Sequence, residues 1–185
     1  AKDAAGNPMW RCSGTLMSDT VFLTAGHCTE APAASVEIWF DPDMQTPGKG
    51  YPFTGEASGT PYTHPLYNDN AFSSYDLGVV VLSQAVNMSG YGALPALDQL
   101  DTLKTRRGQQ DVSFTAVGYG LQQSFPEAAA WKQHNVKIRM VATPHLLQIN
   151  GGIVGYGSLL LSNSASTGGK YIGDSGWLNV IVGTI

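Results

Sequence analysis

Three short segments that lie far apart in the chain each carry one residue suited to proton transfer or nucleophilic attack. They are Thr24-Ala25-Gly26-His27-Cys28, Tyr75-Asp76-Leu77-Gly78-Val79 and Gly173-Asp174-Ser175-Gly176. A serine hydroxyl becomes a good nucleophile when a neighbouring imidazole takes its proton, and the imidazole needs an anion behind it to fix its tautomer. The chain order His27, Asp76, Ser175 is one of the few orders known for such a hydrolytic triad.

Each of these residues is a weaker signal when it is taken alone. His27 follows an apolar segment and Gly26, a position where a histidine is more often structural. Asp76 precedes the apolar residues 77–82, and its simplest interpretation is a solvated residue that closes a turn. The glycines around Ser175 permit a tight turn with converging N–H groups, but such a string also occurs in ordinary loops.

The two cysteines, Cys12 and Cys28, allow two interpretations. They could form a disulfide in an exported protein, which would contribute about 3 kcal/mol to stability in the chain-entropy model. They could also be two reduced, buried thiols in a cytosolic protein. The number of cysteines does not decide between the two.

Short apolar or alternating segments separated by turn signals predict the strands that would position these residues. They cover residues 10–17, 21–25, 36–40, 77–82, 112–117, 136–141, 157–161 and 180–185. Residues 41–61 are rich in proline and glycine and predict a long surface loop, and residues 126–133 and 94–103 are the best candidates for short helices. Many short strands with few helices predict an all-β sandwich or barrel, in one domain or in two lobes joined near residues 98–110.

Composition narrows the classes of partner. Charged residues make up 13% of the 185 residues and the net charge is −4, with no long basic run, which argues against nucleic acid or an anionic membrane as the main partner. No apolar run approaches the roughly 18 residues that span a bilayer. The polar start, Ala1-Lys2-Asp3, is not a signal peptide, so we expect a mature or trimmed chain, although an incomplete reading frame would look the same.

Taken together, six motifs in order resemble the chymotrypsin/trypsin-like serine protease family, and are closest in character to its bacterial secreted branch. The resemblance covers about residues 10–176. The motifs are Cys12-Ser-Gly-Thr-Leu-Met17, Thr24-Ala-Gly-His-Cys28, His64-Pro-Leu-Tyr67, Tyr75-Asp-Leu-Gly78, Ala116-Val-Gly-Tyr-Gly120 and Gly173-Asp-Ser-Gly176.

The resemblance implies a serine endopeptidase that forms an acyl-enzyme. It implies His27 as general base, Asp76 as its orienting anion, Ser175 as nucleophile, and the N–H groups of Gly173 and Ser175 as the oxyanion hole. It also implies a Cys12–Cys28 disulfide, which would hold the turn at His27. No cofactor and no metal are expected.

The same resemblance implies a fold of two packed antiparallel β-barrels, at about residues 1–97 and 105–185, within a single protease domain. The partner would be a polypeptide substrate or a protein inhibitor, with neither nucleic acid nor membrane. We expect a monomer that is secreted, either extracellular or periplasmic.

Several departures from the family pattern bear on activity. An Ile-Val-Gly-Gly-like start, whose amino group would pair with Asp174, is absent, and Trp177-Leu178 stand where the family has Gly-Pro. Gly169, six residues before Ser175, gives no support for cleavage after Lys or Arg. The second barrel is therefore expected to be incomplete and the chain truncated at both ends. The alternative is a catalytically inactive homologue, or a gene fragment, that acts as a protein-binding module.

The remaining polar and aromatic residues give weaker signals. His64, His134 and His145 lack the spacing of metal ligands and are predicted to be surface or core residues. Tyr62, Tyr67 and Tyr75 are predicted to pack or to line a cleft wall. Asp41-Pro42-Asp43 predicts a solvated loop rather than a calcium site, because no ordered ligand spacing follows.

Overall fold

The structure is a computed structural model, and it describes residues 1–68, 70, 75–96, 115–119, 137–143, 145–149, 159–162 and 177–178. The chain divides into two compact units. The first contains Ala1–Ala93 and Lys137–Arg139, and the second contains Leu94–Val136 and Met140–Ile185. The predicted boundary between the barrels, at residues 97–105, lies outside the described residues.

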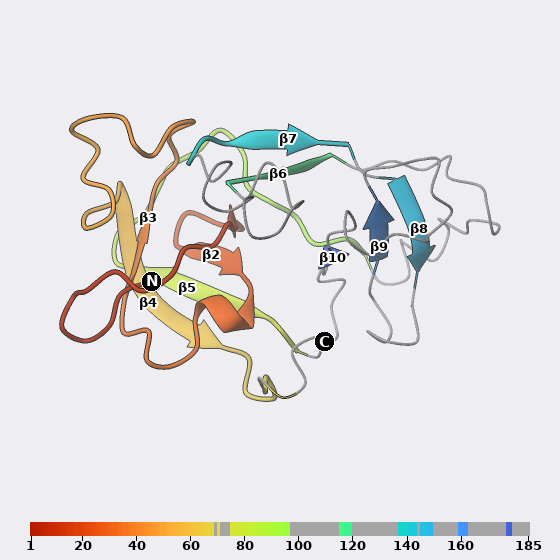
Figure 1. Cartoon of the computed structure of the whole chain (residues 1–185), viewed down its shortest axis with the longest axis horizontal. Helices are drawn as coiled ribbons and strands as arrows, with labels where there is room; N and C mark the ends of the chain where they lie inside the picture. Colours follow the sequence, from red (N-terminus) through yellow and green to blue (C-terminus); the bar gives the residue numbers. More distant parts are fainter. Residues whose placement is uncertain are drawn as a thin grey trace, which may run out of the picture. The chain divides into compact units, whose positions relative to one another are not determined.

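The first unit is built on one antiparallel sheet of five strands, in the order β1-β2-β5-β4-β3, which curls in the manner of half a barrel (Figure 1). A single turn of 3-10 helix, η1, follows β2. The elements are β1 (Thr15–Leu16), β2 (Val21–Thr24), η1 (Gly26–Cys28), β3 (Val36–Ile38), β4 (Ala57–Thr63) and β5 (Gly78–Leu82).

Strand β5 supplies the centre of the core. Its side chains alternate between buried and partly exposed, as the twofold period of a strand requires. Val80 is 0% exposed, whereas its neighbour Val81 faces the other side and is 45% exposed. Val80 and Leu82 pack with Leu16 of β1 and Ile38 of β3, so one face of the curled sheet encloses the core.

The register of the sheet brings three segments of the chain to one place. Gly78, the first residue of β5, pairs with Thr24 at the end of β2 and with Thr63 at the end of β4. Residues that lie just beyond these three positions are therefore neighbours. They include His27, which follows β2, and Asp76, which precedes β5.

The second unit contains two short antiparallel sheets among its described residues. In one, β6 (Ala116–Gly118) pairs with β7 (Met140–Ala142). In the other, the order is β10 (Trp177–Leu178), β9 (Leu159–Ser162) and β8 (His145–Ile149), with an irregularity in register between Leu146 and Gln148. The predicted all-β class is confirmed, because the described elements are strands apart from η1.

One prediction of the sequence analysis is wrong at the end of the loop assigned to residues 41–61. Its last residues belong to β4, which pairs with β3 over its first part and with β5 over the rest. Gly59 and Pro61 hide this strand in the sequence, because both residues are depleted in strands. Pairing with β3 and β5 holds this segment as a strand, although its own residues have a weak preference for one.

Other boundaries also differ from the prediction. The segment 10–17 forms a strand only at Thr15–Leu16, and β8 and β10 were not predicted. The helix candidate 126–133, the strand 180–185 and residues 97–103 of the other helix candidate lie outside the described residues. Among the described residues, no helix is long and apolar enough to cross a membrane.

The loop before β4 is held by polar contacts of its own. The Lys49 Nζ atom lies 2.9 Å from Asp41 Oδ2, and this hydrogen bond lowers the pKa of the Asp41 carboxyl. The backbone N–H groups of Phe40 and Asp41 both donate to Glu56 Oε1. The ammonium group of Lys49 thus pairs with Asp41, one of the two aspartates considered above as calcium ligands.

Candidate active site

His27 lies in η1, the tight turn that follows β2. Ala25, which precedes the turn, is extended, and the Cys28 N–H donates to its carbonyl at 3.2 Å. The N–H groups of Thr29 and Glu30 both donate to the Gly26 carbonyl, at 2.9 and 3.0 Å. These bonds reverse the chain within one turn, so the imidazole projects from a fixed backbone at the end of the sheet.

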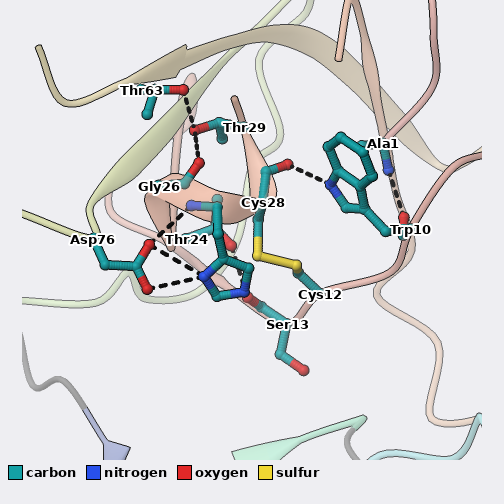
Figure 2. Close-up of a disulfide and its surroundings, with 11 residues drawn as sticks. Ala1, Trp10, Cys12, Ser13, Thr24, Gly26, Cys28, Thr29, Thr63 and Asp76 are labelled. Atoms are coloured by element: carbon teal, nitrogen blue, oxygen red, sulfur yellow. Dashed lines mark hydrogen bonds and ion pairs between the residues drawn. A yellow bond between two sulfur atoms is a disulfide. The ribbon is translucent and has the colours of Figure 1, made fainter. Parts of the chain in front are cut away.

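Asp76 holds His27 through two different groups. Its Oδ1 accepts the backbone N–H of His27 at 2.8 Å, and the imidazole Nδ1 lies 2.9 Å from Oδ2 and 3.1 Å from Oδ1 (Figure 2). The Asp76 side chain is 4% exposed, whereas that of His27 is 38% exposed. A buried carboxylate with these partners is not the solvated turn residue that Asp76 suggests when it is considered alone.

This geometry selects one tautomer of His27. A carboxylate accepts hydrogen bonds, so the proton of the neutral ring lies on Nδ1 and the lone pair on Nε2. The partly exposed ring can then take a proton at Nε2, while the buried carboxylate stabilises the resulting cation. The pair has the arrangement of a general base and its orienting anion.

Gly26 allows the carboxylate to approach the turn this closely. A Cβ atom at this position would lie 3.0 Å from the Leu77 N atom and 3.2 Å from Asp76 Oδ1. These contacts are tighter than an ordinary Cβ contact, so a side chain here would require Leu77 or Asp76 to shift by a few tenths of an ångström. Glycine at this position lets the two segments meet without that shift.

Two threonines brace the turn from the other side. The Thr29 hydroxyl donates to the Gly26 carbonyl at 3.0 Å, and its oxygen lies 2.9 Å from the Thr63 hydroxyl (Figure 2). Thr29 is buried, and Thr63 ends β4. The turn that carries His27 is thereby tied to the same strand end that Gly78 pairs with.

The disulfide Cys12–Cys28 joins the turn to the segment before β1, as predicted (Figure 2). Trp10 adds a second tie, because its indole N–H donates to the Cys28 carbonyl at 3.0 Å. The Thr24 hydroxyl donates to the Ser13 carbonyl at 2.9 Å. Residues 10–13 therefore form a backing layer for the turn instead of extending the strand.

Among the residues that the structure describes, one group has ligand atoms close enough to share a metal ion. It consists of Cys12, His27 and Cys28, whose ligand atoms lie within 4.8 Å of one another. The two sulfur atoms are bonded to each other, and a disulfide lacks the thiolates that a metal requires. In the oxidised chain this group is a support for His27.

The remaining predicted site residues lie outside the described residues. These are Ser175, Gly173 and Asp174, and the described backbone resumes at Trp177 in β10. The described part of the candidate site is thus the His27–Asp76 pair and its supports in the first unit. The roles predicted for Ser175 and for the oxyanion hole stay predictions.

Four residues near the pair were not predicted to support it: Thr29, Thr63, His64 and Tyr75. His64 was predicted only to be a surface or core residue, and Tyr75 to pack or to line a cleft wall. Two of them stand beside site residues in the sequence, since Thr29 follows Cys28 and Tyr75 precedes Asp76. That adjacency was the available signal. His64 opens the motif His64-Pro-Leu-Tyr67, whereas no local pattern links Thr63 to the site. The register of β4 and β5 brings both residues there.

A comparison with protein families finds a match to the family described as Trypsin, over residues 2–176. The matched region spans most of the chain and contains both His27 and Asp76. A comparison with curated proteins finds no match.

Proposed function

The chain belongs to the trypsin family, a family of serine peptidases, and from this premise we propose that it hydrolyses peptide bonds through the triad His27, Asp76 and Ser175. The observation that carries the proposal is the contact between His27 and Asp76. An imidazole whose Nδ1 lies 2.9 Å from a buried carboxylate has the orientation that a general base needs.

In the proposed mechanism, the Ser175 hydroxyl oxygen attacks the carbonyl carbon of the scissile bond while His27 Nε2 accepts the hydroxyl proton. Asp76 stays ionised and stabilises the imidazolium. His27 then gives the proton to the leaving amine, which departs and leaves an ester between Ser175 and the acyl group. Water, deprotonated by His27, hydrolyses this ester and restores the serine.

The N–H groups of Gly173 and Ser175 are proposed to stabilise the oxyanion in both steps. Loss of one such donor typically lowers the rate by about 10²–10³-fold. All the proposed catalytic groups come from the chain itself, and water is the second reactant. The substrate class is polypeptide, and the family pattern at Gly169 assigns no preference for a basic side chain.

We further propose that the chain works outside the reducing cytosol, in a secreted or periplasmic setting. The disulfide beside the general base supports this, since disulfides persist mainly in oxidising compartments. A monomer is proposed as the working form.

The proposed mechanism is tested by labelling the oxidised full chain with a fluorophosphonate probe, which reacts only with an activated serine. We expect one label, on Ser175 by peptide mapping, and hydrolysis of an unstructured protein such as casein. Ser175→Ala should abolish both, because it removes the nucleophile.

The matched control is Ser89→Ala, which removes a hydroxyl from an exposed serine outside the site and should leave labelling unchanged. A folded sample with the disulfide intact that takes up no probe would contradict the proposed activity. Labelling that persists in Ser175→Ala would contradict the assignment of the nucleophile.

A further inference from the structure

Tyr75, the residue before Asp76, has a backbone conformation that its side chain disfavours. Its φ is 56°, and among the described residues it is the one non-glycine residue with positive φ. For a bulky residue this left-handed conformation costs roughly 1–2 kcal/mol, and it persists only where the surroundings enforce it.

The surroundings of Tyr75 contain the groups that enforce the conformation. Its ring stacks on the ring of His64, with the ring centroids 5.1 Å apart and the planes 12° from parallel. Its carbonyl accepts the N–H of Leu77 at 2.7 Å, which closes a three-residue turn with Asp76 at the centre. The Tyr75 side chain nevertheless remains 46% exposed.

His64 is held in place by hydrogen bonds, so its ring can support the ring of Tyr75. It directly follows β4, and its N–H donates to the Leu77 carbonyl at 2.8 Å. Its Nδ1 lies 3.1 Å from the N atom of Leu66 and accepts that N–H. The carbonyl of His64 accepts the N–H of Tyr67 at 2.9 Å.

These contacts connect the residues around His27 and Asp76 in a ring. His27 contacts Asp76, which follows Tyr75 in the chain, and Tyr75 stacks on His64. His64 follows Thr63, whose hydroxyl contacts Thr29, and Thr29 bonds to the turn that carries His27. The stack is partly open to solvent, because Tyr75 is exposed and His64 is half-buried. Removing it leaves the strained backbone before Asp76 without its side-chain support.

We propose that the His64–Tyr75 stack is a positioning device that holds the turn at Asp76 and so aims its carboxylate at His27. The inference rests on the proposed function, because it assigns these residues to the orientation of the general base. Their effect passes through Asp76, whose two oxygen atoms contact His27 at 2.8–3.1 Å.

The first test is independent of turnover. In a Ser175→Ala chain labelled with ¹⁵N-histidine, the proton on His27 Nδ1 should give a downfield NMR signal, because a carboxylate contact deshields it. We expect Tyr75→Leu, which keeps bulk but removes the stacking ring, to shift this signal upfield or broaden it. Tyr75→Phe restores the ring and should rescue the signal.

The second test is kinetic and uses the full chain with Ser175 present. We expect Tyr75→Leu and His64→Ala to lower kcat with KM unchanged, by up to about 10²-fold, the cost of a misplacement near 1 Å. The matched control is Phe53→Leu, which removes an exposed aromatic ring from the loop before β4, outside the stack. It should change neither kcat nor the His27 signal.

The outcomes separate this inference from the proposed function. An active chain in which both variants keep kcat and the downfield signal would overturn the positioning role while the triad stands. A chain that neither labels nor turns over, but loses the signal in both variants, would refute the activity and retain the positioning. If Tyr75→Leu does not fold, His64→Ala removes the stack without altering Tyr75 and decides the question.

Discussion

The Asp76 carboxylate makes two kinds of contact with His27, one with its backbone and one with its ring. Substitutions of Asp76 can separate their effects. One oxygen atom accepts the backbone N–H of His27, which fixes the turn, and both approach the imidazole Nδ1, which fixes the ring. The first contact contributes to stability, because an unpaired buried N–H group is costly. The second would orient His27 as the proposed general base.

We therefore expect Asp76→Asn and Asp76→Ala to behave differently. Asparagine keeps an oxygen atom for the His27 N–H, but its amide group favours the wrong imidazole tautomer. Activity should fall by about 10⁴-fold, the loss associated with this change in a serine protease triad, with little change in stability. Alanine leaves the N–H group unpaired and should also lower the free energy of unfolding by about 1–3 kcal/mol.

Peptidase assays and urea unfolding of the two variants measure these effects. Equal stability of Asp76→Asn and Asp76→Ala would contradict the structural role of the backbone contact. Full activity of Asp76→Asn would contradict the role of Asp76 as orienting anion.

At the scale of elements, the site depends on the place where three strand ends meet. Gly78 begins β5 between the ends of β2 and β4, and it is buried against the turn that carries His27. A Cβ atom there would overlap the Thr29 hydroxyl and the Ala25 carbonyl. Glycine is required because backbone and a braced side chain occupy the space.

Gly78→Ala should lower the free energy of unfolding by about 1–3 kcal/mol, as overpacking does, and should also lower activity because η1 must shift. Gly90→Ala is the matched control, since no described atom lies within 4 Å of a Cβ atom there and its φ is not positive. That control should be neutral or stabilise by up to about 1 kcal/mol. Urea midpoints of the two variants check this, and equal midpoints would contradict the packing argument.

At the scale of the whole molecule, the disulfide acts on the unfolded chain as well as on the site. It joins residues 16 positions apart, so it restricts the conformations of the unfolded chain before any strand forms. Among the described residues of the first unit, few side chains are fully buried, and Val80 lies in their core cluster. We therefore expect the covalent constraint to contribute to the stability of the first unit.

Replacing both cysteines, as in Cys12→Ser with Cys28→Ser, should lower the free energy of unfolding by about 3 kcal/mol, the value expected for a loop of this length. Urea unfolding measures the loss. Reducing the wild-type chain should produce the same loss, while reductant should not affect the double variant. A loss well below 1 kcal/mol would show that the constraint contributes little.

The sequence by itself determined the class of fold and the residues worth testing. Short alternating segments such as 77–82 predicted strands because the twofold period of a strand is local, and β5 confirms it. The family followed from motifs in order, and the match over residues 2–176 confirms it. Cys12 and Cys28 were paired by resemblance, and the structure joins them.

Only the tertiary structure decided how the candidate site is held together. Taken alone, Asp76 was best interpreted as a solvated residue, and β4 was hidden by Gly59 and Pro61, because burial and strand pairing depend on partners far away in the chain. The register that sets Gly78 between β2 and β4 brings Asp76 to His27 and Tyr75 to His64. Such long-range pairing has no local signature, so the sequence named the candidate base and its proposed anion, but not the contacts that position them.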